Sequence, residues 1–353
     1  MVEVLGDRGA GHLTLVDPAT DPVWAQLASG PGGSLFSAPP WIGALGKTYD
    51  FEISAWVAND AFGEPVAGVP LARIPSSGGE RISVLPFSDY CDPIRGSDGM
   101  WELLSDRLLD THKPVAIRVL HDDECRNDPR LAPKRQDWWH AIDLDREVDD
   151  MWSDMSSSAR RAIRRAEASE LTVRLGEGPA DLRSFYELHR SVRKAKYRLL
   201  AQPFAFFEEL ADAFGDRLIL MTAWLGDELV AGVLYLAWQD TLYYKFNASS
   251  SEHLDVRPND AMMWEGMKLA RASGYQSIDL GRSDDGHEGL LRYKRKFATS
   301  EAHLTELRSL GSAPVDDLDL DPVWTGLTEL LTRPEVPDEI TEEAGALLYR
   351  FFA

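Results

Sequence analysis

Residues 218–248 read LILMTAWLGDELVAGVLYLAWQDTLYYKFNA, and this stretch decides the fold of the second half of the chain. Two apolar runs, 218–224 and 228–238, flank Gly226-Asp227, a dipeptide that favours a tight β-hairpin. A third run, 241–248, predicts another strand directly after the second. The stretch therefore predicts three strands that meander antiparallel to one another.

Further predicted elements surround this meander. Helix, strand, helix and helix precede it and helix and strand follow it, over residues 152–167, 171–175, 179–196, 203–214, 259–273 and 277–280. A glycine-bearing loop and a short basic segment at 290–297 then complete the half. This order predicts a mixed, mostly antiparallel sheet with helices on both faces.

The first half of the chain predicts a similar but weaker pattern. Strands over 51–57 and 65–74 form a plausible hairpin, and VLPFSDYCDP (84–93) predicts a buried turn at a strand end. A helix near 100–110 precedes a strand over 115–120. We expect an α+β (α/β) fold with two tandem domains, 1–145 and 146–310, and C-terminal helices over 311–353 that pack back on the body.

Composition excludes several classes of protein. The chain has 353 residues, 44% of them hydrophobic, which rules out wholesale disorder. The longest apolar run, 229–238, is far shorter than the roughly 20 residues of a membrane span. The first residues lack the features of a signal peptide, so we expect a soluble, cytoplasmic protein. The chain has only two cysteines and no HExxH motif, so we expect neither a disulfide framework nor a metal site.

Charge is distributed unevenly along this acidic chain. The net charge is −21, which on average repels nucleic acid. Residues 151–200 nevertheless carry 11 basic against 6 acidic side chains, and a second basic cluster lies at 292–296. Such clusters suit a phosphorylated ligand because guanidinium groups bind phosphate oxygens bidentately. For most individual arginines, a solvated helix surface is the favoured alternative.

The stretch DLGRSDDGHEGLLRYKRKFA (279–298) contains the strongest candidates for chemistry. A strand ends at Gly281 and leaves Arg282 and Asp284 at its carboxyl edge, where sites in α/β domains tend to lie. Lys294, next to Tyr293, is expected to face the same site. Its ammonium suits stabilisation of the oxyanion that develops during amide formation.

Other titratable residues have two possible roles. His189 and His287 have the chemistry of general bases, but no Ser or Cys partner pattern accompanies either, so a structural role is favoured. Asp284 and Asp285 either accept a proton from an amine or cap a turn.

Several segments together resemble the FemABX-like (peptidoglycan-bridge aminoacyltransferase) branch of the GNAT superfamily, including its BioF2-like acyltransferase-domain proteins. They occur in order from about residue 34 to residue 352. The matching segments are SLFSAPPWI, LPFSDYCDP, the W-x(7)-R-x-x-I-R-x-A run of 152–166, FYELHRSVR, QPFAFFEEL, ELVAGVLYL, LYYKFNAS, DLGRSDDGHEGLLRYKRKFA and TGLTELLTRPEVPDEITEEAGALLYRFF.

The resemblance implies two tandem GNAT-like domains and assigns site residues. The family's Phe-Lys pair falls on Tyr293-Lys294, its Phe-Gly on Phe297-Ala298, its helix arginine on Arg193, and its aromatic strand position on Tyr244 beside Lys245 and Asn247. Members of the peptidoglycan branch transfer an amino acid from aminoacyl-tRNA to an amine of a cell-wall precursor, and others are thought to use acyl-CoA. The Tyr and Ala departures alter the shape of the acceptor site.

The donor remains open between these two classes. The R/Q-x-x-G-x-G/A loop of common acetyl-CoA enzymes is absent, since RLGEG (174–178) and RSDDG (282–286) have the wrong spacing. No sustained heptads predict a coiled-coil arm for tRNA. The charge of −21 favours a small thioester donor over tRNA.

We therefore expect an enzyme, an N-acyltransferase or aminoacyltransferase that moves an acyl group to a primary amine in a cell-envelope, polysaccharide or natural-product pathway. No metal and no tightly bound cofactor are expected; acyl-CoA or aminoacyl-tRNA is the co-substrate and a small amine the acceptor. The alternative is a non-catalytic GNAT scaffold that binds a glycan or nucleotide-sugar. The expected catalytic residues are Lys294 and Tyr244, and the expected binding residues are Arg193, Lys245, Asn247, Arg282, Asp284 and Tyr293.

Overall fold

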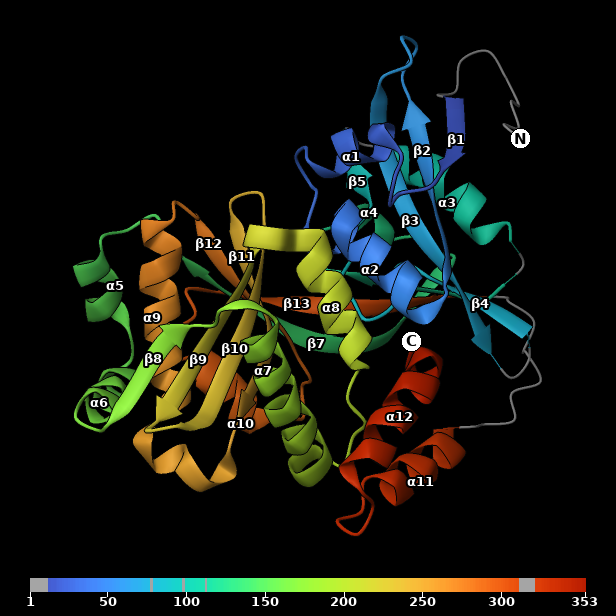
Figure 1. Cartoon of the computed structure of the whole chain (residues 1–353). Helices are drawn as coiled ribbons and strands as arrows, with labels where there is room; N and C mark the ends of the chain where they lie inside the picture. Colours follow the sequence, from blue (N-terminus) through green and yellow to red (C-terminus); the bar gives the residue numbers. More distant parts are fainter. Residues whose placement is uncertain (1–11, 77–78, 97–98, 112, 311–320) are drawn as a thin grey trace. The chain divides into compact units, whose positions relative to one another are not determined.

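The computed structural model describes residues 12–76, 79–96, 99–111, 113–310 and 321–353, which divide into two compact units (Figure 1). Of these residues, unit 1 contains those up to Asp137, 303–310 and 350–353; unit 2 contains 138–302 and 321–349. The start of the chain, where no signal peptide is expected, and positions 311–320 of the predicted tail lie outside the described residues.

The contact-based division differs from the predicted boundaries. Strands β7 (Leu131–Asp143) and β13 (Ser300–Ser309) each contribute residues to both units, so the chain changes unit within a strand. Helices α11 (Asp321–Leu331) and α12 (Asp338–Leu348), which the sequence places in a separate tail, belong to unit 2. Local sequence patterns mark the ends of strands, whereas the division depends on which distant strands pair.

Unit 2 contains the predicted meander. Its strands lie in the order β7, β12, β11, β10, β9, β8, and every pairing is antiparallel except the parallel pair of β11 with β12. The bounds are β8 (Leu171–Leu175), β9 (Leu218–Leu225), β10 (Glu228–Trp238), β11 (Thr241–Ser249) and β12 (Ser277–Ser283). Gly226 has a φ of 57° in the hairpin turn, a left-handed conformation that favours glycine.

The helices of unit 2 follow the predicted order with two changes. They are α5 (Val148–Asp154), α6 (Ser157–Glu167), α7 (Gly178–Val192), α8 (Phe204–Phe214), α9 (Pro258–Ala272) and α10 (Glu288–Lys294). The helix predicted over 152–167 is two helices, because the Ser156 hydroxyl accepts a hydrogen bond from the Ala159 N–H and caps α6. α7 ends in a π-helical turn, Arg193–Tyr197.

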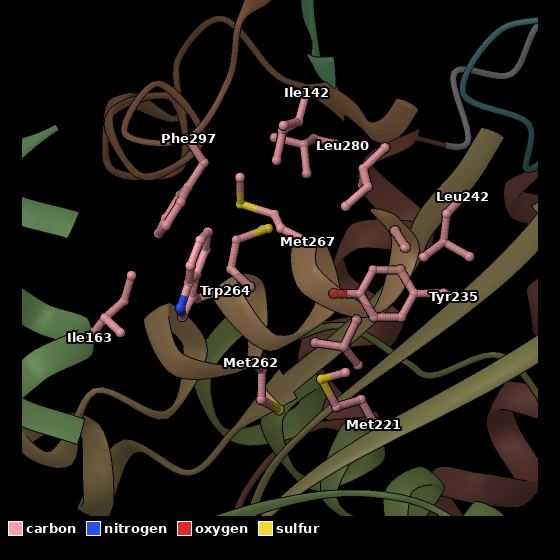
Figure 2. Packing of buried hydrophobic residues seen from close by; sticks show 14 of the residues in the cluster. Ile142, Ile163, Met221, Tyr235, Leu242, Met262, Trp264, Met267, Leu280 and Phe297 are labelled. Carbon is pink, nitrogen blue, oxygen red and sulfur yellow. The ribbon is translucent and has the colours of Figure 1, made fainter. Parts of the chain in front are cut away.

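Two layers of helices bury the faces of this sheet. Methionine and aromatic side chains of α9 pack against β10, β11 and β12, as Figure 2 shows for Met262, Met267, Tyr235 and Leu242. On the other face Phe185 of α7 lies against Gly232, where an added Cβ would come within 2.5 Å of the Phe185 ring. The core therefore fixes β10 and β11 from both sides.

Unit 1 repeats the strand order of unit 2. Strands β1 (His12–Val16), β2 (Glu52–Asn59), β3 (Pro65–Ser76) and β4 (Gly79–Ser83) are successively antiparallel, as the predicted hairpin requires. β4 then pairs in parallel with β6 (Val115–Val119), which pairs antiparallel with β13. The short β5 (Ile94–Arg95) pairs with β3. The expected α+β fold, with mixed and mostly antiparallel pairing of strands flanked by helices, is confirmed, and the described strands form one continuous sheet.

The helices of unit 1 are α1 (Pro22–Ala28), α2 (Pro39–Tyr49), α3 (Met100–Leu109) and α4 (Asp123–Arg126), among the residues described. No helix in the described segments is long and apolar enough to cross a membrane.

Candidate active site

The two parallel strands of unit 2 part before they end. The last pair between them is Tyr243 with Asp279. Beyond this pair, β11 continues through residues 244–249 and β12 through 280–283, and we call these two ends the strand fork. Ligand sites of α/β sheets lie at the carboxyl ends of parallel strands, so the fork is the natural place for a site in this unit.

Lys294 reaches one side of the fork. Its ammonium donates hydrogen bonds to the carbonyl oxygens of Gly281 and Arg282, both at 2.9 Å, and the residue is 5% exposed. Gly281 has a φ of 69°, and its N–H donates to the Asp279 carboxylate at 2.6 Å. A buried ammonium needs such partners, because unpaired charge is strongly disfavoured away from water. Lys294 is therefore fixed at the end of β12.

Tyr293 reaches the other side of the fork. Its hydroxyl donates to the carbonyl oxygen of Asn259 at 3.0 Å and shares a hydrogen bond with the hydroxyl of Tyr244 on β11. Burial raises the pKa of Tyr244 and of Tyr293 above the usual value of 10, so both are neutral phenols at pH 7. Neutral phenols donate hydrogen bonds and do not act as bases. Adjacent residues of α10 thus contact both strands of the fork.

Amide side chains continue this network toward α9. The Asn247 amide donates to the side-chain oxygen of Asn259 at 3.2 Å, and the Asn259 amide donates to the Ser249 hydroxyl at 3.0 Å. Close by, the Lys296 ammonium pairs with the buried carboxylate of Asp260 at 3.1 Å. Sequence reasoning named Asn247 and included Lys296 in a basic cluster, but it missed Ser249, Asn259 and Asp260. The signal for Asn259 and Asp260 was the polar start of α9 shortly after a strand.

A β-bulge sets the directions of side chains along β11. Tyr235 pairs with Tyr244 and Leu234 with Phe246, so Lys245 is an extra residue without a partner position on β10. Phe246 consequently turns toward α8, where its ring lies 4.9 Å from that of Phe207. The Lys245 ammonium lies 6.0 Å from the centre of the Phe246 ring. Bulges of this kind re-aim side chains next to active sites.

Two predicted anion-binding arginines already have partners. The Arg193 Nε donates to the carbonyl oxygen of Leu200 at 2.7 Å, and its guanidinium lies 6.0 Å from the Tyr349 ring centre. Arg282 lies 3.5 Å from the Asp284 carboxylate at the end of β12. Within the described chain, Arg193 makes no hydrogen bond to the fork. The structure thus brings Arg282 and Asp284 together, and it places Arg193 at the start of the π-helical turn that follows α7.

Three of the eleven basic residues in the cluster predicted over 151–200 pair with acidic residues of α12. Arg183 and Arg190 of α7 both bind the Glu342 carboxylate, and Lys194 pairs with Asp338 at 2.7 Å. These side chains stabilise the packing of the C-terminal helices on α7. These three side chains therefore have acidic partners that lie about 150 residues away in the sequence, which agrees with the alternative that individual basic residues of this cluster have a structural role.

His189 has a structural environment. It is buried against Phe185, Phe207 and Phe246. Burial, and secondarily the positive charge of Arg193, lowers the pKa of His189 to about 3. The imidazole is neutral at pH 7 and packs as an aromatic ring, in agreement with the favoured structural role.

Comparison with known proteins relates this chain to GNAT acyltransferases. Residues 153–295 match the model of the family described as "Acetyltransferase (GNAT) domain". The crystal structure of FemX aligns with a TM-score of 0.63 at 16% identity over 87% of this chain and 98% of that chain. A tandem GNAT protein from the clavulanic acid biosynthesis pathway aligns with a TM-score of 0.55 at 12% identity over 86% of this chain and 99% of that one. Unit 2 carries a GNAT acyltransferase domain.

A short stretch of the chain is also similar in sequence to a glycyltransferase. The Lipid II:glycine glycyltransferase of Staphylococcus haemolyticus (strain JCSC1435) is 34% identical over 76 residues, which cover 20% of this chain and 18% of that protein. The match therefore spans under a fifth of the relative's length. This local similarity, the match to the GNAT domain and the fold shared with FemX are what the chain has in common with the FemABX-like branch of the GNAT superfamily.

Proposed function

We propose that this protein transfers an activated acyl or aminoacyl group to a primary amine and that the strand fork of unit 2 is its active site. The observation that carries this proposal is the buried Lys294 ammonium, fixed by two carbonyl oxygens where the parallel strands part. Tyr244 and Tyr293, both neutral, face the same place from β11 and α10. A fixed cation beside neutral donors suits a reaction in which negative charge develops on a carbonyl oxygen.

The proposed reaction proceeds by direct attack of the amine on the donor carbonyl. A C–N bond forms, and the carbonyl oxygen becomes an oxyanion that the Lys294 ammonium stabilises. The C–O or C–S bond to the leaving group then breaks, and the proton of the attacking amine passes to the leaving oxygen or sulfur. Tyr244 is placed to donate a hydrogen bond during this step. No covalent enzyme intermediate is required.

Other residues would hold the two substrates. Asn247 and Tyr293 line the fork beside Tyr244, and Lys245 occupies the bulge of β11. Arg282 and Asp284 offer both charges at the end of β12, and Arg193 lies one helical turn from His189 on the α7 side. We assign these six residues to binding of a phosphate, a carboxylate or the acceptor amine.

The substrate class follows from the family and from the charge. The named relative transfers glycine to lipid II, so we propose a cell-envelope amine as the acceptor and a cytoplasmic location. The donor is acyl-CoA or aminoacyl-tRNA, and it acts as a co-substrate without a tightly bound cofactor. A net charge of −21 favours the smaller thioester, because an acidic protein repels a polyanion as large as tRNA.

The test measures acyl transfer to a panel of amines from aminoacyl-tRNAs and acyl-CoAs. Lys294→Met should lower kcat by about 100-fold or more, the usual effect of removing an oxyanion stabiliser. Lys134→Met, at an exposed lysine of β7, is the matched control and should retain wild-type turnover. Wild-type turnover of the Lys294 variant would remove its assigned role. Thermal stabilisation by UDP-sugars with no turnover of any donor would instead favour a binding scaffold.

A further inference from the structure

A fully buried histidine lies on β7 opposite Gly281, whose carbonyl oxygen binds the Lys294 ammonium. His140 of β7 is 0% exposed, and its Nε2 lies 2.8 Å from a carboxylate oxygen of Glu301, at the start of β13. The same carboxylate accepts hydrogen bonds from Arg295 at 2.6 and 3.0 Å. Arg295, and then His140, lowers the pKa of Glu301, so the carboxylate is ionised and can only accept. His140 Nε2 is therefore the donor.

The charge on His140 is set by its surroundings. Burial, followed by the positive charge of Lys294, lowers the pKa of His140, and Glu301 opposes this effect. The charged groups that act on the ring are Lys294 at the end of α10, Arg295 directly after it and Glu301 of β13. The imidazole is consequently neutral at pH 7. Its Nδ1, a lone-pair acceptor in this tautomer, is buried without a hydrogen-bond partner among the described residues.

Strand β12 is distorted directly opposite His140. Asp279 pairs with Ala141 and Arg282 with Trp139, so Leu280 and Gly281 together face the single residue His140. This bulge, with Gly281 at positive φ, allows the carbonyl oxygens of residues 281 and 282 to bind the Lys294 ammonium. The ammonium, its two carbonyl partners and the imidazole therefore belong to one local arrangement at the β7–β12 pair.

We propose that His140 and Glu301 are positioning residues for Lys294. The carboxylate orients the imidazole, and the neutral ring adds no second positive charge to the buried surroundings of the ammonium. Protonation of His140 would place two cations side by side in a buried site and would displace or deprotonate Lys294. Transfer activity should therefore decline as the pH falls through the His140 titration. This inference rests on the proposed function of Lys294 and adds residues that the sequence did not indicate.

The first experiment does not depend on activity. Nitrogen-15 NMR of the His140 ring in the full-length protein should show the Nε2–H tautomer and a titration below the ordinary histidine value. Lys294→Met should move this titration to higher pH, because the nearby cation is gone, and Glu301→Gln should move it to lower pH. An unchanged titration in Lys294→Met would overturn the proposal even if that variant is inactive.

The second experiment separates positioning from folding. His140→Phe should lower kcat by about 10-fold or more with KM within about twofold, the range expected for loss of a supporting residue. His140→Gln, which keeps a donor for Glu301, should recover part of the loss. His287→Phe, at an exposed loop histidine, is the matched control. Wild-type kcat in His140→Phe would contradict the proposal.

If His140→Phe does not fold, the pH–rate profile of Glu301→Gln provides the test. Its acid limb must shift to lower pH, and an unshifted limb would refute the proposal.

Discussion

The parallel strand pairs of the two units have the same topology but different surroundings. In unit 1 the segment after β4 stays on β6, since the Val84 N–H donates to Ala116 and the Cys91 N–H to Arg118, both at 2.9 Å. In unit 2 no such bonds join β11 and β12 beyond Asp279, among the residues described. The same fold thus has a closed strand end in one unit and an open one in the other.

The side chains follow the same contrast. In unit 1, Phe87 and Tyr90 pack on aromatic residues of the preceding helices, with Phe87 4.8 Å from Tyr49 and Tyr90 5.1 Å from Phe36. Asp92 ends the segment by accepting hydrogen bonds from three consecutive backbone N–H groups of residues 120–122. Unit 2 has tyrosine hydroxyls, asparagines and an ammonium at the equivalent place. Unit 1 thus fills this place with packed rings and backbone hydrogen bonds, whereas unit 2 has polar side chains there, as the proposed active site requires.

The largest expected effect tests the closed end of unit 1. Phe36→Ala removes a fully buried ring that contacts both Trp41 and Tyr90, and it should lower the free energy of unfolding by about 3–5 kcal/mol. Phe62→Ala, the same change at a ring that is 92% exposed, should have an effect within about 0.5 kcal/mol. Urea unfolding of both variants makes the comparison. Similar losses in the two would contradict the described packing.

The open end of unit 2 should respond in activity. Tyr244→Phe removes one hydroxyl from the fork while it keeps the ring, so kcat/KM should fall by about 10- to 100-fold. The thermal midpoint should change little. Tyr90→Phe is the matched change in unit 1, and it should leave kcat/KM unaltered. The contrast between the units fails if the two hydroxyl deletions lower activity equally.

The pH dependence of stability should reflect His189. In the unfolded chain His189 is protonated below about pH 6.5, whereas in the folded protein it stays neutral down to about pH 3. The free energy of unfolding must therefore decrease as the pH falls from 6.5 to 3. From pH 6.5 to pH 5 the loss from His189 alone is about 1.5 kcal/mol. His189→Phe should reduce this slope in urea titrations at the two pH values. A slope equal to that of the wild type would show that His189 does not titrate as described.

The smallest expected effect concerns the contact of α7 with α12. Glu342→Gln leaves Arg183 and Arg190 without their shared carboxylate and should cost about 1 kcal/mol at low salt and less at high salt. Glu187→Gln, which breaks an exposed pair on α7 alone, should cost about 0.3 kcal/mol. Urea unfolding of both variants at low and at high salt measures the two losses in the free energy of unfolding. A salt-independent loss for Glu342→Gln would argue against an electrostatic contact.

Local pattern was sufficient for much of the fold. The apolar runs and the Gly226-Asp227 turn predicted β9, β10 and β11 within a few residues, because hairpins form between neighbouring segments. The resemblance added Tyr244 and Asn247 beside Tyr293-Lys294, and the structure does bring these side chains to one strand fork. For Arg193 the structure shows a hydrogen bond from its Nε to the Leu200 carbonyl oxygen, and its assignment to the site stays a prediction.

The sequence by itself determined strands β8 to β12, helices α7, α8 and α9 and the adjacent pair Tyr293-Lys294, since these depend on local periodicity and on neighbours in the chain. Tertiary structure alone decided that Glu342 neutralises the arginines of α7 and that Glu301 orients His140. Both depend on pairing between segments 150 or more residues apart. Local periodicity carries no information about such pairs, because burial and charge are settled only when distant segments pack together.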